Sequence, residues 1–193
     1  MMDSILRHVS DKIELSPRDQ EIFLSLLKPK SFANKTTILD PGDICRNQSF
    51  VVDGCLKIFY PDVNGDEHIV KFAIENWWAF DIESFFESTP SYYGIACLEP
   101  TTVLQLSQED HKELLSRVPA FERFYRLMIQ QSFIALQYRV TQSLSLTAEV
   151  RYKHFQEKYP GLENRISQKH IASYLGITPV FLSMIRKQEL EKH

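Results

Sequence analysis

The sequence has little of what marks membrane proteins and several classes of enzyme. No apolar run approaches the roughly 18 residues that a membrane-spanning helix needs, and the first residues lack the apolar core of a signal peptide. We therefore expect a cytoplasmic protein that has no membrane partner. The six glycines are not clustered into a phosphate-binding loop, and no Gly-x-Ser-x-Gly motif occurs. Glu83 with His68 or Asp81 is the nearest approach to an acid–base pair, and no fixed spacing supports it, so we expect no enzyme.

Signals for metals, cofactors and disulfides are also scarce. The three cysteines, Cys45, Cys55 and Cys97, are odd in number and lie in separate apolar runs, so we expect buried free thiols. None of the six histidines has another four residues away, the spacing that places two metal ligands on one helix face. A cysteine cluster for iron–sulfur and a set of axial haem ligands are missing as well. We expect neither a metal nor a cofactor.

The most informative segment that is present spans residues 166–187, near the C-terminus. Ser167 can cap a first helix, Gly176 supplies a turn, and Thr178 caps a second helix with Pro179 at its first position. The two helices have apolar residues at the spacing of an inward face: Ile171, Ala172, Leu175, Leu182 and Ile185. This pattern predicts a helix-turn-helix whose second helix is free to enter the major groove of DNA. The alternative is a packed helical hairpin without a ligand.

The distribution of charge favours DNA as the partner of this end. Residues 1–150 carry 14 basic and 21 acidic side chains, a net charge of −7. Residues 151–193 carry 8 basic and 4 acidic side chains, a net charge of +4. A basic terminal unit on an acidic body is the arrangement expected where one end meets a polyanion, although a solvated charged face has a similar composition.

The region before residue 107 has the pattern of short strands. Ser16 and Pro17 open a helix that ends near Pro29, and five strand-like runs follow at residues 36–39, 49–52, 55–60, 68–74 and 94–106. Turn sequences separate the runs, the clearest being Asn64-Gly65, a strong hairpin signal. Strands at this spacing predict a small barrel or sandwich.

After Ser107 the apolar period changes to that of helices, and Pro119 starts a long helix that runs to about Leu144. The helix has two apolar stripes: Ile129, Phe133, Leu136 and Val140, and Phe121, Phe124, Met128, Gln131, Ala135 and Tyr138. One stripe can pack on the strand domain, and the other is then best buried against a second copy in a two-fold dimer. The predicted interface consists of Phe121, Phe124, Met128, Ile129, Phe133, Leu136 and Val140. The alternative is a single broad stripe on a large core.

The order of these parts resembles that of the cyclic-AMP receptor protein and fumarate-nitrate regulator (Crp/Fnr) superfamily. The similarity is carried by four segments: Leu39–Asp43, Phe50–Tyr60, Asn64–Glu67 and Ile171–Pro179. It implies an α+β fold with an N-terminal double-stranded β-helix, the cyclic-nucleotide-binding-like β-roll, then a long dimerisation helix and a winged-helix-like C-terminal domain with the helix-turn-helix. The corresponding domains are residues 1–118, 119–146 and 147–193. The resemblance also implies a homodimer that binds a palindromic operator, with RNA polymerase as a further candidate partner.

The sensor pocket departs from the family pattern. Cyclic-nucleotide binders hold the ribose with the Glu of a Gly-Glu-Leu cassette and the phosphate with a later Arg. Alignment on Phe80 and Glu83 puts Ile82 at the glycine and Tyr93 at the arginine, and neither can neutralise a phosphate. The candidate pocket residues are Phe80, Ile82, Glu83, Ser84, Tyr93 and Gly94, with Leu136 and Gln137 where the base would be read. We expect a degenerate pocket that aromatic side chains fill or whose effector is unknown; a less charged, apolar ligand is the alternative.

The second helix of the helix-turn-helix also departs from the pattern. Val180 and Met184 stand where relatives place a Glu and an Arg that read base edges, so phosphate contacts predominate. The predicted DNA-contacting residues are Ser167, Gln168, Lys169, Thr178, Pro179, Val180, Ser183, Met184, Arg186 and Lys187. The sequence thus predicts a homodimeric DNA-binding regulator that does not respond to cyclic AMP. The alternatives are a degenerate member that acts through protein contacts and a sensor of an unidentified apolar ligand.

Overall fold

Two short helices begin the chain in the computed structural model, which describes residues 2–191. Helix α1 spans Met2–Ser10 and helix α2 spans Pro17–Leu26. The start of α2 is fixed by a capping box, in which the Ser16 hydroxyl accepts from the Asp19 amide and the Asp19 carboxylate accepts from the Ser16 amide, both at 3.2 Å. Helix α2 was predicted from the sequence, and α1 was not.

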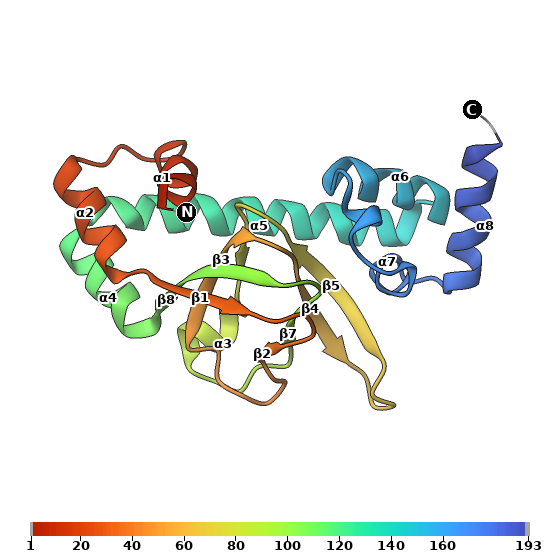
Figure 1. Ribbon diagram of the computed structural model, residues 1–193, viewed down its shortest axis with the longest axis horizontal. Helices are drawn as coiled ribbons and strands as arrows, with labels where there is room; N and C mark the ends of the chain where they lie inside the picture. Colours follow the sequence, from red (N-terminus) through yellow and green to blue (C-terminus); the bar gives the residue numbers. More distant parts are fainter. Residues whose placement is uncertain (1, 192–193) are drawn as a thin grey trace.

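Eight strands form the β-roll as two four-stranded antiparallel sheets (Figure 1). The first sheet has the order β1 (Lys28–Phe32), β8 (Thr101–Ser107), β3 (Asn47–Asp53) and β6 (Trp78–Ala79). The second has the order β2 (Thr37–Leu39), β7 (Gly94–Cys97), β4 (Leu56–Pro61) and β5 (Glu67–Ala73), so β5 lies at an edge. The short helix α3 (Ile82–Glu87) interrupts the strands.

The expectation of one strand over residues 94–106 is wrong. This stretch is two strands, β7 and β8, which belong to different sheets. The chain changes sheets at Leu98–Pro100, where the Leu98 amide donates to the Cys55 carbonyl at 2.9 Å and Pro100 has no amide hydrogen to continue a ladder. The core between the sheets includes Cys97, and all three cysteines are buried free thiols, as predicted.

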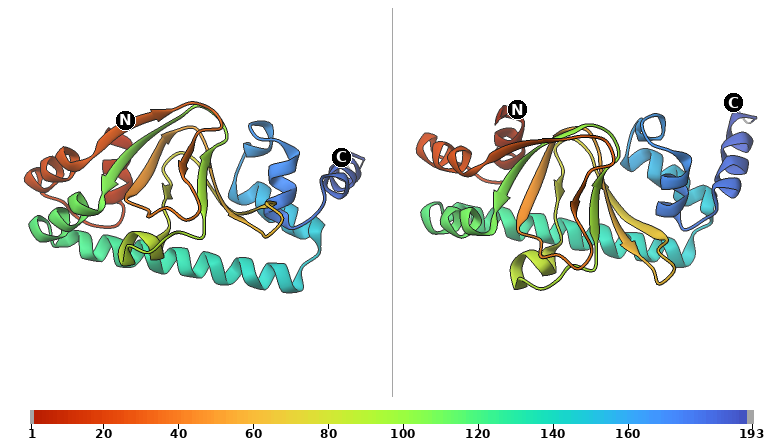
Figure 2. Two further views of the ribbon diagram at one scale, coloured as in Figure 1. Left: turned by 90° about the horizontal axis from the view of Figure 1, so that it is seen from below. Right: turned by 60° about the horizontal axis from the view of Figure 1, so that its bottom comes forward.

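The long helix α5 (Ala120–Ser145) follows α4 (Gln108–Arg117) and runs along the whole β-roll (Figures 1 and 2). Its first turns pack against α1 and α2, and Phe121, Phe124 and Met128 are buried in the same apolar cluster as Ile5 and Phe23. These three residues of α5 were predicted for the dimer interface. That part of the prediction is corrected, because the N-terminal helices of the same chain already cover them.

The C-terminal unit is helical (Figure 1). It contains α6 (Ala148–Lys158), a 3-10 turn (Leu162–Asn164), α7 (Gln168–Leu175) and α8 (Pro179–Leu190). Tyr152, Phe155 and Tyr159 of this unit pack with Ile69 and Phe72 of β5, so one apolar cluster joins the unit to the roll. Up to residue 191 no strand follows β8, and the predicted similarity to a winged helix therefore concerns the helices alone.

Two kinds of feature are absent from the part of the chain that the structure describes. Within residues 2–191 no helix has both the length and the apolar character needed to cross a membrane. The same residues contain no group of three histidine, cysteine or acidic side chains placed to hold a metal ion.

Candidate effector pocket and DNA-reading helix

A cavity of about 700 Å³ lies between the β-roll and α5. Its apolar walls come from β4, β5, the segment from Trp77 to α3, the loop before β7, and α5. The residues are Ile58, Val70, Trp77, Trp78, Phe80, Ile82, Tyr93, Met128, Ile129, Ala135 and Leu136. This volume lies within the range of small-molecule sites. The expectation that aromatic side chains fill the pocket is therefore wrong, since the two tryptophans and Phe80 line the space without closing it.

Five of the eight predicted pocket residues line the cavity, namely Phe80, Ile82, Glu83, Tyr93 and Leu136. Two of these residues stand at the positions that hold the phosphate in cyclic-nucleotide binders. Ile82 begins α3 and Tyr93 precedes β7, and neither side chain supplies a positive charge. Asp81 caps α3 by accepting from the Glu83 amide at 3.1 Å, and it also accepts from the Ser91 hydroxyl at 2.6 Å. The wall at α3 thus lacks a cation for a phosphate.

The other three predicted residues are elsewhere. The buried Ser84 hydroxyl accepts from the Cys45 amide at 2.8 Å and donates to the Thr89 carbonyl at 2.6 Å, so it holds the loop before β7. Gly94 packs against Phe59, whose ring would lie 2.3 Å from a Cβ at this position, so sheet packing accounts for the glycine. Gln137 is exposed on α5 and is not part of the cavity wall.

Cations that were not predicted also line this cavity, among them Lys71 of β5, Arg139 of α5 and Lys158 of α6. Burial and the neighbouring Lys158 lower the pKa of Lys71 to about 8. Burial also lowers the pKa of Lys158, with a smaller effect from Arg139. The one available signal was a lysine inside the otherwise apolar run Ile69–Ile74, and it did not show which other residues would join it.

The helix-turn-helix has the predicted geometry. Gly176 adopts a left-handed conformation with φ of +66°, and the Thr178 hydroxyl accepts from the Phe181 amide at 3.2 Å to cap α8. The five residues predicted for its inward face are all buried. Ser167 lies at the N-cap position of α7 but makes no capping bond with its side chain, which instead pairs with His170 Nδ1 at 3.0 Å.

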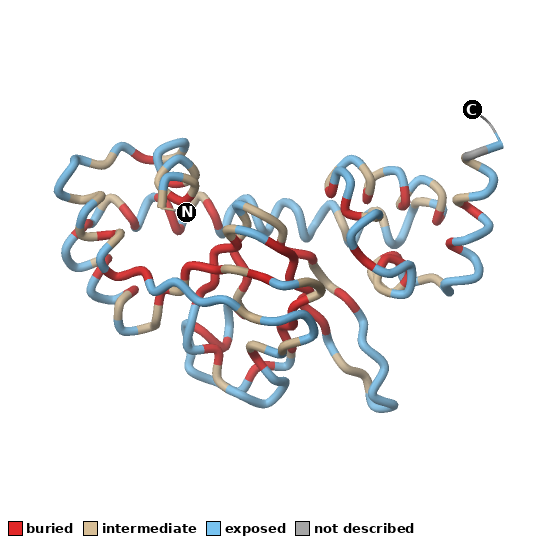
Figure 3. Tube along the Cα trace, viewed as in Figure 1, coloured by how far each residue is buried: buried red, intermediate tan, exposed pale blue. Residues whose placement is uncertain are grey.

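Helix α8 presents an outer face at the end of the molecule opposite the N-terminal helices (Figures 1 and 3). Val180 and Met184 are 72% and 52% exposed on this face, and Ser183 is exposed beside them. Gln168, Lys169, Thr178, Pro179 and Lys187 are exposed as well, whereas Arg186 is half-buried. Phe181 is not among the residues predicted to contact DNA; it is a further exposed apolar residue of this surface, together with Val180 and Met184, as the alternative of a protein-contact surface expects.

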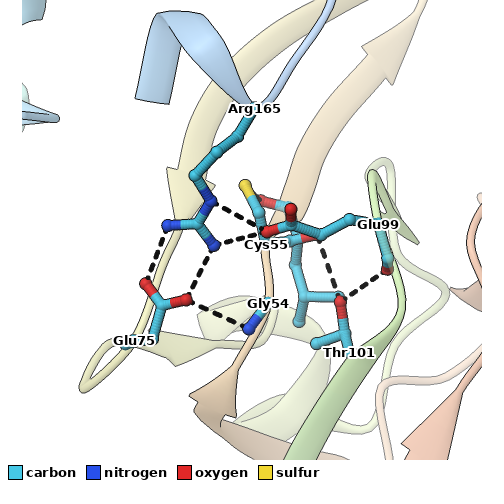
Figure 4. A network of polar contacts seen from close by, with 7 residues as sticks. Gly54, Cys55, Glu75, Glu99, Thr101 and Arg165 are labelled. Atoms are coloured by element: carbon cyan, nitrogen blue, oxygen red, sulfur yellow. Dashed lines mark hydrogen bonds and ion pairs between the residues drawn. The ribbon is translucent and has the colours of Figure 1, made fainter. Parts of the chain in front are cut away.

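Polar contacts attach the C-terminal unit to the β-roll (Figure 4). Arg165 pairs with Glu75 at 2.7 Å and also with Glu99, and Glu75 accepts from the Gly54 amide at 3.1 Å. These contacts raise the pKa of the Arg165 guanidinium and lower that of the Glu75 carboxyl, although burial opposes both shifts. The contacts fix the segment before α7 to the turns that follow β5 and β7.

Comparisons with known proteins agree with this architecture. Residues 29–118 match the family model of the cyclic nucleotide-binding domain. Among solved structures, the c-di-GMP responsive global regulator CLP of Xanthomonas campestris is 18% identical over 92% of this chain and 93% of its own, with a TM-score of 0.70. FixK2 of Bradyrhizobium japonicum is 13% identical over 86% and 85%, with a TM-score of 0.75. A CooA mutant of Carboxydothermus hydrogenoformans is 16% identical over 96% and 84%, with a TM-score of 0.69.

The chain has the fold of the Crp/Fnr regulators. The predicted resemblance and α+β fold class are thereby confirmed, with the β-roll, the long helix and the C-terminal helices in the predicted order. No curated protein sequence matches the chain significantly. The assignment of the Crp/Fnr fold therefore rests on the domain match and on the similarity to solved structures.

Proposed function

We propose that this Crp/Fnr-fold protein is a homodimeric, DNA-binding transcriptional regulator that does not respond to cyclic AMP. The observation that carries the proposal is a capped helix-turn-helix whose second helix leaves its outer face uncovered. The neighbours CLP and the Thermus thermophilus catabolite activator protein, described by name as a global regulator and an activator, agree with it. The proposed units are residues 1–118 for sensing, 119–146 for dimerisation and 147–193 for DNA binding.

The proposal of a dimer rests on the second half of α5. Phe133 and Val140 are 58% and 51% exposed, and Ile129 and Leu136 are exposed on the same stripe. Four large apolar residues at helical spacing form a patch that a second copy of α5 would cover. A two-fold dimer would also place two copies of α8 for the two halves of a palindromic operator.

The proposal that cyclic AMP is not the effector rests on the wall near α3. A cyclic phosphate held as in cyclic-nucleotide binders would contact Ile82 and Tyr93, and its charge would be buried without a partner there. We expect calorimetry to show binding of cyclic AMP and cyclic GMP no tighter than about millimolar. Micromolar binding would contradict this part of the proposal.

Selection of bound DNA from a random pool with the purified protein tests the whole proposal. The expected result is a palindromic sequence with weak preference at each position, since Val180 and Met184 cannot form bidentate contacts with bases. The second candidate function is regulation through protein contacts, which the exposed Val180, Phe181 and Met184 favour, with RNA polymerase as a candidate partner. Retention of no DNA even at low salt would favour that candidate.

A further inference from the structure

Three positive side chains meet at one end of the cavity, although they come from three different parts of the molecule. Lys71 belongs to the β-roll, Arg139 to the second half of α5, and Lys158 to the last turn of α6 in the C-terminal unit. The ammonium groups of Lys71 and Lys158 lie 5.8 Å and 5.9 Å from the centre of one Trp77 ring. The three cations thus form a single group.

The hydrogen bonds of this group are made to neutral atoms. Lys71 Nζ donates to the Trp78 carbonyl at 2.9 Å, and Arg139 Nη2 donates to the carbonyls of Ile69 and Tyr174 at 3.0 and 3.1 Å. Throughout residues 2–191, no carboxylate forms an ion pair within 4.0 Å of any of the three. Three like charges consequently line the same cavity, and none of them has a carboxylate partner.

An unpaired group of half-buried cations destabilises the free protein, and an anion in the cavity would offset that cost. The lowered pKa of Lys71 and that of Lys158 agree with this interpretation. His8 of α1 and Lys12, two residues after the end of α1, add further basic groups to the lining. The acidic residues of the lining, Asp81 and Glu83, belong to the α3 segment, which lies at the other end of the roll from α6 (Figure 1).

We propose that the cavity binds an organic anion whose carboxylate or phosphate lies at Lys71, Arg139 and Lys158 and whose apolar body packs on Trp77, Trp78 and the facing residues of α5. Charged groups make stronger hydrogen bonds than neutral ones, so the cations favour an anionic group. The apolar walls favour a ligand whose apolar part has the size of an aromatic ring. This proposal names the ligand class of the effector pocket and so rests on the proposed regulator for its biological role. The binding step itself is measured without DNA.

The placement of the cations gives such a ligand a mechanical effect. An anion at this point neutralises residues of the roll, of α5 and of α6 together, so it favours the arrangement in which the C-terminal unit packs on β5. Removing the anion restores repulsion among Lys71, Arg139 and Lys158 and weakens that packing. The ligand would therefore control how firmly α8 is held relative to the dimerisation helix.

Calorimetry with the full chain and a matched series of naphthalene compounds tests the proposal. The series consists of 2-naphthylacetate, 2-(2-naphthyl)ethanol and 2-(2-naphthyl)ethylamine, which share a body and differ in charge. We expect the acid to bind at least about tenfold more tightly than the alcohol, and the amine most weakly. 2-Naphthyl phosphate, compared with the acid, shows whether phosphate or carboxylate is the preferred group. No measurable binding of either anion, equal affinity for acid and alcohol, or preference for the amine would overturn the proposal.

Variants locate the anion within the cavity. Lys71→Met and Lys158→Met keep the length of the side chain and remove its charge, so each should reduce the affinity for the acid about tenfold and leave that for the alcohol unchanged. Lys71→Arg should retain most of the affinity. Lys153→Met, on the exposed surface of the same helix as Lys158, is the matched control and should bind like the wild type. If Lys158→Met binds the acid as tightly as Lys153→Met does, the assignment is wrong, and random-pool selection still tests DNA binding separately.

Discussion

The hydroxyl of Ser173 in α7 donates a hydrogen bond of 2.6 Å to the carbonyl oxygen of Glu67 in β5. The same hydroxyl accepts from the Ile69 amide at 3.0 Å, so a side chain of the helix-turn-helix occupies two backbone groups of the sheet. The Phe72 amide donates to the Tyr159 hydroxyl at 3.4 Å, a further contact between the sheet and the C-terminal unit. The C-terminal unit is therefore held by the edge of the roll and not by α5 alone.

Replacement of Ser173 by Ala should loosen this contact. The backbone groups of Glu67 and Ile69 lose their partner, which we expect to lower the free energy of unfolding by about 1 kcal/mol and the melting temperature by about 2–4 °C. Thermal melting followed by circular dichroism measures the change. Ser183→Ala, on the exposed face of α8, is the control and should melt like the wild type. Equal melting of the two variants would show that the Ser173 contact contributes nothing.

Neutralising Arg165 should free the segment before α7. Arg165→Gln removes the ion pairs with Glu75 and Glu99, and we expect faster amide exchange in β5 and α7 and a loss of stability of up to about 1 kcal/mol. Hydrogen-exchange mass spectrometry resolves the two segments. Arg117→Gln removes an exposed pair with Glu113 on α4 and serves as the control. Unchanged exchange in α7 would mean that apolar packing alone holds the unit.

Charged substitutions on the exposed stripe of α5 should yield monomers. Phe133→Asp with Val140→Asp places two carboxylates in the proposed interface, where burying them costs several kcal/mol in total. Light scattering at micromolar concentration should show a dimer for the wild type and a monomer for the double variant. Val63→Asp, at the exposed tip of the β4–β5 hairpin, should remain dimeric. A monomeric wild type would refute the dimer.

DNA binding by α8 should depend on its positive charges more than on contacts with bases. Replacing both Arg186 and Lys187 by glutamine should weaken binding to all DNA sequences alike and make the affinity less dependent on salt concentration. Lys112→Gln, on the exposed side of α4, should change neither property. Both quantities come from competition binding at several salt concentrations. An effect confined to one DNA sequence would show that these two side chains read bases.

The converse substitutions test where α8 lies. Val180→Glu with Met184→Arg restores the residue types that relatives place at these positions, and each new bidentate contact contributes about 1–3 kcal/mol against the wrong base. We expect a gain of preference at G·C positions in the random-pool selection. If neither binding nor preference changes, α8 does not enter a groove, and the alternative of a protein partner gains support.

The stability of the fold should decline in mild acid because of His111. Burial and the nearby Lys112 lower the pKa of His111 to about 4 from 6.5. The unfolded chain then binds more protons than the folded chain between these values, so stability falls as the pH drops from 6.5 to 4. We expect a loss on the order of 1 kcal/mol in denaturant titrations. His111→Phe should reduce this dependence, while His8 and His170, whose pKa values are lowered too, retain part of it. If the stability of the wild type and that of His111→Phe depend equally on pH, His111 is not the cause of the decline.

Local sequence signals predicted the parts of the structure that depend on neighbouring residues. Gly176 and Thr178 fix the turn and the cap of the helix-turn-helix within a few residues, and the apolar period of α5 is set along one helix. Helix α3 escaped prediction because its aromatic residues have no helical cap signal beyond Asp81. The cation group was not predictable, since Lys71, Arg139 and Lys158 meet only after the roll, α5 and α6 have packed.

The position of β5 at the edge of its sheet gives the docked helices a protective role. An edge strand presents free amides and carbonyls that can pair with a strand of another molecule and start aggregation. Ser173 and Arg139 occupy the backbone groups of Glu67 and Ile69 on this strand. Any movement that releases the C-terminal unit therefore uncovers a surface prone to self-association, which limits how long the molecule can stay open without precipitating.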